Sequence, residues 1–539
     1  MKKIFILLSL FLFTQANAQL VSYEKLDSFT VAELQSLIDG IGFGNLLTPE
    51  YGVDIYRVLY RTEFLDSTTL VSGVLAVPKN VVCKVPLVCY QHGTSSKKNN
   101  VPSYNADEKN IAIFFASLGN VVVAADYIGL GSSTINLHPY MHNFSQAHSG
   151  INLMRSARQL NETLDLNLGN QIFLFGYSQG GSAAAAVVKY IEEDYSSEFK
   201  VTAAAPMSGA YNVAGEQYKM VNSGLPYATP GYLPFIIMSY QMMYGNMYNS
   251  PSDVFKAPYD TLMPDLLFGH NYNMGYINNQ ATPVPTDMFI DSVRIYIDAH
   301  PEHPFRQALQ DNDLISWTPQ THMRLLYCDG DEQVSYRNSV VADSVWNYNG
   351  APHITSQNFG TFSHGDCVGL ALLNGKNYFE SFYNNGVEII VKYNEDLNSY
   401  QASIFEDDIA NYNLLWSNGS TTATLGNVNP NTQYTLTATH KTNGCTHTRT
   451  FNKQTVVSVS DLLSNELGFK LYPNPANNLI TIEINSKNEK AIITNLLGQK
   501  ILELNLETQK TTIDISKFEK GIYVFSLVNR NLKEKFIVE

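Results

Sequence analysis

Cysteine and basic side chains are scarce in this 539-residue sequence. Five cysteines are too few for a disulfide scaffold, and none stands in a C-x-x-C pair, which argues against zinc binding and thioredoxin-like chemistry. Lysine and arginine number 35 against 49 aspartates and glutamates, and the net charge of −14 argues against binding to nucleic acid or an anionic membrane surface. With 16% charged and 44% hydrophobic residues, the composition is that of a globular protein.

Long apolar runs are also missing, except at the N-terminus. Two lysines precede the almost purely apolar run Ile4–Phe13, which is followed by the small-residue exit Ala16-Asn17-Ala18. A run of about ten residues is too short to cross a ~30 Å hydrocarbon core as a membrane anchor. We therefore expect residues 1–18 to be a signal peptide that is cut after Ala18. Since no later run reaches ~18 apolar residues, we expect the mature protein to be soluble and exported, where disulfides can form.

Apolar strand patterns and helical patterns alternate from about Val53 to His364. This alternation predicts an α/β domain over residues 19–385, with a mostly parallel sheet covered by helices on both faces. The first two strands follow each other without a helix, which suits an antiparallel start. The expected helices are Glu108–Leu118, Gln146–Leu164 and Ser182–Glu193. The expected strands are Val53–Thr62, Leu70–Val77, Val85–Gln91, Val121–Ala125, Gln171–Phe175, Val201–Pro206 and Met323–Cys328.

The last third of the sequence reads as two small all-β sandwich domains. Residues 386–458 hold short alternating segments separated by turn formers such as Ser417-Asn418-Gly419. This stretch resembles the Ig-like and adhesin-type modules of secreted bacterial proteins, which usually carry no chemistry.

The stretch 461–539 resembles the C-terminal sorting domain of type IX secretion. It opens on Tyr472-Pro473-Asn474-Pro475, continues with the Leu-Gly turn in Asn495–Ile501 and the hairpin Ile513–Leu527, and closes on Lys535–Glu539. The resemblance implies passage through the periplasm and export by the type IX secretion machinery. Removal of the tail or attachment to the cell surface would follow.

The motif that points to chemistry is Gly176-Tyr177-Ser178-Gln179-Gly180. It follows an apolar strand and precedes a helix of small residues, which is the strand–turn–helix setting of a nucleophile elbow. The alternative is a structural glycine-rich turn. In the elbow interpretation Ser178 is the nucleophile, exposed at the positive end of the following helix.

A serine nucleophile needs a base oriented by an acid, and in this fold they follow in the order Ser, Asp, His. Asp331 lies in the loop after the strand Met323–Cys328 and is our candidate acid, with Asp329 as its competitor. His364 lies just before the last apolar helix and is our candidate base, with His353 as its rival.

An oxyanion hole needs two backbone N–H groups. One is expected from Gln179, directly after the nucleophile, and the other from the loop Gln91-His92-Gly93-Thr94, where we choose Thr94. His92 is expected to hold the turn.

Two further segments narrow the family. The sequence is similar to secretory lipases and related esterases at two places. One is Asp126-Tyr127-Ile128-Gly129-Leu130-Gly131 with His138-Pro139-Tyr140, and the other is the segment Pro304–Pro319. Over about Tyr51–Tyr383 the sequence thus resembles the secretory lipase branch of the α/β-hydrolases, which implies an α/β-hydrolase fold and no cofactor. Metal binding by His138, His142 and His148 is not expected, because Pro139 disfavours a helix there and no carboxylate completes a cluster.

The long stretch of about 208–318, poor in strand patterns, predicts an inserted lid or cap. Its segment Tyr232–Tyr248 is apolar almost all round, which indicates a helix that is buried in the cap, lines an acyl pocket, or does both. The leading expectation is a secreted serine hydrolase, a lipase or carboxylesterase, that cleaves carboxylic esters through an acyl-enzyme. Its expected substrate is an ester with an apolar acyl group. The alternatives are a serine exopeptidase on the same fold and a surface adhesion protein.

Cys328 ends the strand that delivers the candidate acid, and Cys367 lies three residues after the candidate base. Because these two loops must meet, the two cysteines either form a bridge or remain separate buried thiols.

Overall fold

The computed structural model describes residues 20–40, 48–104, 106–394, 397–405, 407–429, 432–452, 469–472, 476, 478–484, 489–495, 500–508, 510–518, 521–527 and 532–538. The expected signal peptide, residues 1–18, lies outside these ranges. The chain divides into two compact units, residues 1–387 and 388–539. Within the described part of the chain, no helix is long and apolar enough to cross a membrane.

The first unit is built on a nine-stranded sheet in the order β1-β2-β3-β5-β4-β6-β7-β8-β9. The pairs among β1, β2, β3 and β5 are antiparallel, and all pairs from β5 through β4 to β9 are parallel. The predicted α/β fold with an antiparallel start is confirmed. The strands are β1 Leu20–Phe29, β2 Val53–Phe64, β3 Ser67–Pro78, β4 Val85–Gln91, β5 Val121–Ala125, β6 Leu168–Tyr177, β7 Ala203–Met207, β8 His322–Tyr327 and β9 Ile354–Asn358.

Helices cover both faces of this sheet, because the side chains of each buried strand alternate between two apolar layers. In β5, Val121 and Val123 belong to one buried cluster, whereas Val122 and Ala124 belong to the other. The first cluster includes side chains of α3, α4 and α11, and the second includes side chains of α1, α2 and α12. The bounds are α1 Val31–Gly40, α2 Ala106–Ser117, α3 Asn143–Gln159, α4 Gln179–Asp194, α11 Arg337–Tyr348 and α12 His364–Glu380.

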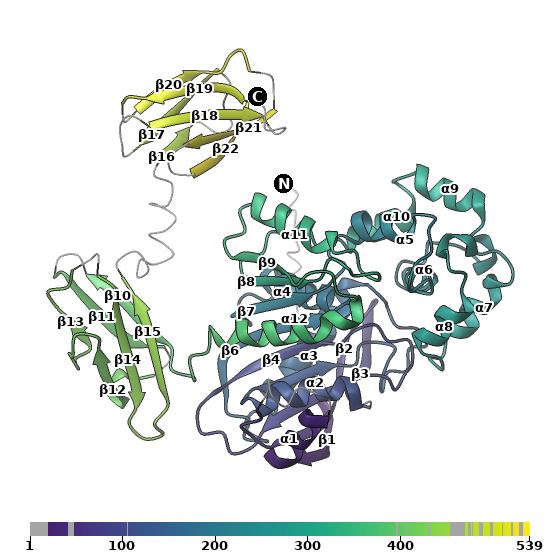
Figure 1. Ribbon diagram of the computed structural model, residues 1–539, viewed down its shortest axis with the longest axis horizontal. Coiled ribbons are helices and arrows are strands. Elements are labelled where there is room, and N and C mark those ends of the chain that lie inside the picture. The colour runs from purple at the N-terminus through teal and green to yellow at the C-terminus, as the bar shows by residue number, and fades with distance from the viewer. Residues whose placement is uncertain are drawn as a thin grey trace, which may run out of the picture. The chain divides into compact units, whose positions relative to one another are not determined.

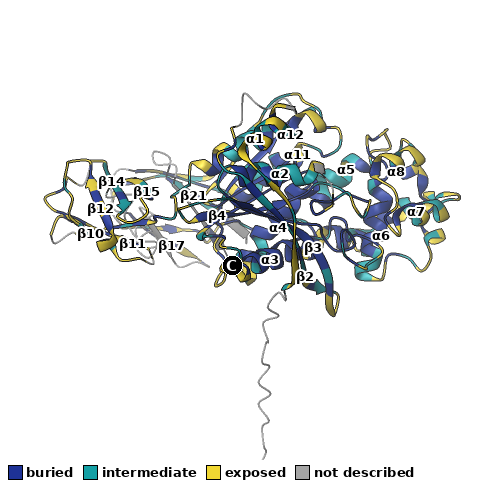
Figure 2. Ribbon diagram, turned by 90° about the horizontal axis from the view of Figure 1, so that it is seen from below, coloured by how far each residue is buried: buried dark blue, intermediate teal, exposed yellow. Residues whose placement is uncertain are grey.

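The central helix α4 is buried over its first ten residues, Gln179–Val188 (Figure 2). After Gln179, the first half of the helix consists of glycine, serine and alanine, and Ala183–Ala186 are all fully buried. Small side chains allow the helix backbone to lie close to the sheet, so that the N-terminus of α4 is fixed against the ends of the parallel strands.

The insertion between β7 and β8 is helical, as expected, and forms a cap at one end of the sheet (Figure 1). It has a buried cluster of its own, which includes most of the first two turns of its central helix α6. Helix α6 ends at Tyr244 because Gly245 takes a left-handed conformation, with φ of 74°. The cap helices are α5 Tyr218–Val221, α6 Tyr232–Tyr244, α7 Tyr259–Leu267, α8 Met274–Gln280, α9 Asp291–Ala299 and α10 Pro304–Asp311, with short turns η1 Val213–Gln217, η2 Pro251–Asp253 and η3 Pro285–Met288.

The described residues of the second unit form four small antiparallel sheets, as the sandwich patterns predict. The sheets β10-β11-β13 and β12-β14-β15 come from the Ig-like stretch, where Tyr400, Trp416 and Phe451 are buried. The sheets β16-β17-β20 and β19-β18-β21-β22 come from the sorting stretch and share one apolar cluster. The elements are β10 Ile389–Asn394, β11 Ser399–Ile404, η4 Ile409–Asn411, β12 Tyr412–Trp416, β13 Thr424–Leu425, β14 Tyr434–His440, β15 Thr446–Phe451, β16 Phe469–Tyr472, β17 Leu479–Ile484, β18 Glu489–Asn495, β19 Lys500–Leu506, β20 Lys510–Asp514, β21 Gly521–Leu527 and β22 Leu532–Val538.

Candidate active site

Ser178 stands alone between the end of β6 and the start of α4, in a strained backbone conformation with φ of 61° and ψ of −123°. The turn is this tight because glycine surrounds it. A Cβ atom on Gly180 would lie 2.0 Å from the carbonyl oxygen of Gln91, and one on Gly176 would lie 2.2 Å from the carbonyl oxygen of Gly180. No side chain fits at either position, so the glycines of the motif are required by packing. The result is the expected elbow, with Ser178 at the N-terminus of a 16-residue helix.

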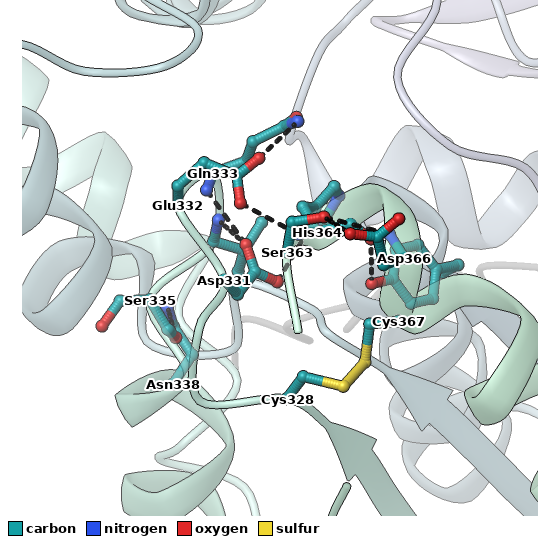
Figure 3. Close-up of polar contacts among 12 residues, drawn as sticks. Cys328, Asp331, Glu332, Gln333, Ser335, Asn338, Ser363, His364, Asp366 and Cys367 are labelled. Atoms are coloured by element: carbon teal, nitrogen blue, oxygen red, sulfur yellow. Dashed lines mark hydrogen bonds and ion pairs between the residues drawn. A yellow bond between two sulfur atoms is a disulfide. The ribbon is translucent and has the colours of Figure 1, made fainter. Parts of the chain in front are cut away.

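Asp331 and His364 lie side by side, although 33 residues separate them in the chain. The Nδ1 atom of His364 lies 2.7 Å from Oδ2 of Asp331, and both side chains are buried (Figure 3). The other carboxylate oxygen of Asp331 accepts the backbone N–H groups of Gln333 and Val334, at 2.9 and 2.8 Å. Asp331 is therefore held from both sides, and its bond to Nδ1 leaves Nε2 of His364 as the atom able to take a proton.

The two competing residues lie elsewhere. Asp329 is exposed, and its carboxylate accepts a 2.9 Å hydrogen bond from the amide of Asn358. This hydrogen bond contributes most to lowering the pKa of Asp329. The ring of His353 stacks on that of His322, with ring centres 3.8 Å apart. The structure thus pairs Asp331 with His364. Neither Asp329 nor His353 belongs to this pair.

Two residues that the sequence analysis did not single out hold the backbone of His364. The carboxylate of Glu332 accepts the N–H of His364 at 2.9 Å, and the hydroxyl of Tyr177 donates to its carbonyl oxygen at 2.6 Å. Partial burial raises the pKa of Glu332, but hydrogen bonds, first that from His364, more than offset this and lower it. A carboxylate near a helix N-terminus is favourable in general. The sequence alone does not show that the loop carrying Glu332 faces the N-terminus of α12.

A disulfide joins Cys328 and Cys367, with Cα atoms 6.1 Å apart (Figure 3). Cys328 comes directly after β8, and Cys367 lies in the first turn of α12. The bridge therefore links the loop that carries Asp331 to the helix that begins with His364. Of the two outcomes left open by the sequence, the bridge is confirmed.

The loop after β4 is held beside the elbow by the Asp126-Tyr127 segment. The buried carboxylate of Asp126 accepts hydrogen bonds from Ser72 at 2.5 Å and from the N–H of Ser103 at 2.9 Å, while its burial raises its pKa. The ring of Tyr127 stacks on that of His92 at 4.3 Å, and its hydroxyl donates to the carbonyl oxygen of His92. His92 thus has the structural surroundings expected of it, and Thr94 lies two residues further along the same loop.

The side chain of Gln179 is bound to His138. The Nδ1 atom of His138 lies 2.9 Å from the carbonyl oxygen of Ile128, which can only accept, so Nδ1 carries the proton. The Nε2 atom must then accept, and it lies 2.7 Å from the amide nitrogen of Gln179. Complete burial lowers the pKa of His138 to about 3, so the ring stays neutral near pH 7.

The other two histidines of the candidate metal cluster have separate partners. His142 caps α3 through its contact with Ser145, and His148 lies between the carbonyl oxygen of Phe144 and the hydroxyl of Tyr195. In the described ranges, no three His, Cys, Asp or Glu side chains gather in a way that could hold a metal ion.

A pocket opens directly at Ser178 and runs under the cap. It encloses about 570 Å³, its open mouth included, and Ser178 and Gln179 line it on the side of the sheet. Among the described residues that line it, none is charged. From α6, Tyr232, Leu233 and Ile236 face it, so this helix is both buried and part of the pocket wall. The other apolar lining residues are Met141, Ala210, Val213, Val221, Phe305, Leu309 and Val334.

Comparison with known families gives two matches. Residues 103–257 match the secretory lipase family, and residues 470–539 match the secretion system C-terminal sorting domain. Among curated proteins, none matches the chain significantly.

Solved structures agree with the first match. The rice cell wall degrading esterase LipA from Xanthomonas oryzae is 28% identical, with a TM-score of 0.58 over 67% of this chain and 95% of LipA. A hydrolase from Legionella pneumophila is 26% identical, with a TM-score of 0.63 over 67% of this chain and 98% of the other. Candida antarctica lipase A, at 15% identity and a TM-score of 0.53 over 67% of this chain and 81% of the lipase, shares the fold.

The sorting domain directs the protein through type IX secretion to the cell surface or the extracellular space. The Ser178 elbow, the pair of Asp331 and His364 and the apolar pocket all lie in the first compact unit. The chain is therefore a carboxylic-ester hydrolase with an α/β-hydrolase fold that is similar to the secretory lipases, and it carries a C-terminal type IX sorting domain.

Proposed function

We propose that the protein is a serine esterase that works through an acyl-enzyme, with Ser178 as nucleophile, His364 as base and Asp331 as the acid that orients the base. The observation that carries this proposal is the 2.7 Å contact of Asp331 with Nδ1 of His364, in the same fold as the strained elbow at Ser178. This contact fixes the tautomer in which Nε2 of His364 is free to accept a proton.

In the first half-reaction, Nε2 of His364 takes the proton of the Ser178 hydroxyl while its oxygen attacks the ester carbonyl carbon. The negative charge that develops on the carbonyl oxygen is stabilised by the N–H groups of Gln179 and Thr94, at the positive end of α4. The tetrahedral intermediate then collapses, and His364 returns the proton to the departing alkoxide. The products of this step are an alcohol and an acyl group bound to Ser178.

In the second half-reaction, water replaces the alcohol. His364 takes one proton from the water, the hydroxide adds to the acyl carbonyl, and the acid leaves as Ser178 recovers its proton. Throughout, the carboxylate of Asp331 orients His364 and stabilises its imidazolium form.

The acyl group of the ester is proposed to lie in the pocket under the cap. Its lining is apolar apart from the hydroxyl of Ser178, tyrosine hydroxyls and the amides of Gln179 and Gln217, and this composition favours a hydrocarbon chain over a charged group. The cell-wall esterase named above is a relative of the catalytic unit, and we extend from it only the ester bond as the target.

We also propose the domain layout that accompanies this function. Residues 1–18 would direct export, residues 19–385 would carry the chemistry, and residues 208–318 would form the cap. Residues 386–458 would act as an Ig-like spacer, and residues 461–539 as the signal for type IX secretion.

The deciding experiment compares two substrate classes. The full-length protein and its Ser178→Ala variant are assayed on p-nitrophenyl acyl esters and on aminoacyl anilides. We expect ester hydrolysis that Ser178→Ala abolishes, together with labelling of Ser178 by a fluorophosphonate. Faster cleavage of anilides would instead indicate an exopeptidase, and the absence of both activities would leave the adhesion alternative.

A further inference from the structure

The side chain of Tyr218 lies between the pocket and the solvent. Its ring lines the same pocket as Ser178, but it belongs to α5 of the cap, whereas Ser178 lies between β6 and α4. Its hydroxyl donates a 2.6 Å hydrogen bond to the exposed carboxylate of Asp298 on α9. The same side chain thus lines the pocket and, through its hydroxyl, reaches a carboxylate at the protein surface, so it forms part of the wall between the two.

This wall is fixed by contacts from three sides. The guanidinium of Arg306 lies 4.1 Å from the centre of the Tyr218 ring, and the ring of Phe305 meets it edge-on at 6.4 Å. The carboxylate oxygen of Asp298 that accepts from Tyr218 also accepts from the amide of Asn222, at 2.7 Å. Burial, followed by the hydrogen bond to Asp298, raises the pKa of Tyr218 to about 12, so its hydroxyl remains a donor near neutral pH.

We propose that Tyr218 is the specificity-determining residue that ends the acyl pocket and so limits the length of acyl chain that the enzyme accepts. This inference rests on the proposed function, because it takes the pocket to hold the acyl group. An acyl chain that enters at Ser178 and runs under the cap meets the ring of Tyr218 before it can reach solvent. A longer chain has to bend or stay outside, and apolar surface left outside gains no burial energy.

The test measures kcat/KM on p-nitrophenyl esters from acetyl through hexanoyl and dodecanoyl to hexadecanoyl. In Tyr218→Ala the pocket opens beside Asp298, and we expect the ratio of dodecanoyl to hexanoyl hydrolysis to rise about tenfold or more, as pocket changes of a methylene or larger do. Tyr218→Phe keeps the ring and should keep the wild-type preference. Tyr296→Ala removes an exposed tyrosine of the neighbouring α9 that does not line the pocket, and serves as the matched control.

A second variant tests the opposite direction. Val221 lies one helical turn from Tyr218 on α5 and lines the same pocket, so Val221→Phe should shorten the preferred chain. Melting temperatures of both variants show whether the cap is folded. An unchanged chain-length preference in folded Tyr218→Ala and Val221→Phe overturns this inference while leaving the esterase intact. If the wild-type protein hydrolyses none of the esters, the proposed function itself fails.

Discussion

The side-chain amide of Gln179 and the imidazole of His138 are joined by a hydrogen bond of 2.7 Å. Gln179 follows the candidate nucleophile, and its backbone N–H is our first candidate oxyanion donor. The fixed, neutral ring of His138 therefore restrains the residue on which this donor depends. This contact also gives a role to the His138-Pro139-Tyr140 segment, which the proposed chemistry does not otherwise use.

We predict that His138→Leu lowers kcat for a p-nitrophenyl ester by about tenfold or more while changing KM little, because loss of an oxyanion donor outright costs ~10²–10³ in kcat. His138→Gln, which can still accept from Gln179, should recover part of the loss. Since the pKa of His138 is about 3, the pH profile between 5 and 9 should keep its shape in both variants. A displaced pH profile would mean that His138 takes part in proton transfer instead.

The two aspartates of the loop after β8 are distinguished by substitution. We expect Asp331→Asn to lower kcat by about three to four orders of magnitude, because an amide no longer holds His364 in the required tautomer. Asp329→Asn is the matched control, since Asp329 is exposed and bound to Asn358, and it should change kcat less than about twofold. Steady-state rates of the two variants decide the matter, and the reverse order would assign the acid to Asp329.

Glu332 is predicted to position the base through its backbone. In Glu332→Ala the N–H of His364 loses its acceptor, and kcat/KM should fall about tenfold, in line with the cost of leaving one partner of a charged hydrogen bond unpaired. Glu332→Gln keeps an acceptor oxygen and should retain most of the activity. Equal losses in the two variants, measured at several pH values, would mean that the charge of Glu332 matters and not its hydrogen bond.

Buried histidines should make the protein sensitive to acid. Burial lowers the pKa of His138 to about 3 and those of His142 and His270 to about 4, below the value of about 6.5 for an unfolded chain. Between about pH 6.5 and these lower pKa values, the unfolded state binds more protons at the three histidines than the folded state does. The stability that is present above pH 6.5 is therefore lost as the pH falls.

Thermal melting measured from pH 7.5 to 4.5 tests the direction in which stability changes with pH. We expect the melting temperature to fall with pH, and to fall less in His270→Asn. Asparagine suits position 270 because its φ is +56°, a conformation that asparagine tolerates better than most residues. A melting temperature that rises towards pH 4.5 would contradict the prediction.

Processing can be read from the mass of the exported protein. We predict that the mature enzyme begins at Gln19 and lacks most of residues 461–539, because the first is the expected product of signal cleavage and the second is the sorting domain. Intact-mass spectrometry of the culture supernatant and of cell-surface extracts measures both ends. A full-length chain found only inside the cells would contradict it.

Local sequence was sufficient to predict most of the strands of the sheet and the chain positions of the candidate site residues. Buried strands are read from continuous apolar runs, and the order of Ser178, Asp331 and His364 follows the order of the strands that precede them. Strand β1 was missed because most of its residues are exposed, so that it shows no apolar alternation. The expected helix Gln146–Leu164 ends earlier, at Gln159, and begins at Asn143, where His142 caps it.

Contacts between distant segments could not be predicted from the sequence. Glu332 and His364 meet only because the loop after β8 folds against the N-terminus of α12, and the Cys328–Cys367 bridge depends on the same approach. The position of Tyr218 in the pocket wall depends on how α5, α9 and α10 pack, and no periodicity within the cap segment reveals that.

Most of the buried side chains of the cap belong to one apolar cluster, which is separate from the two layers that cover the sheet. The side chain of Asp331 and the backbone of His364 are bound by the loop after β8 and by Tyr177, whereas the cap reaches that loop through Gln217 and Tyr227, which donate to the carbonyl oxygen of Gln333. Mutations in the cap away from these two contacts can therefore accumulate over evolutionary time with little effect on the geometry at Asp331 and His364. Related enzymes could diverge in the substrates they select while they inherit an unchanged reaction, and an engineer could exchange caps between them in the same way.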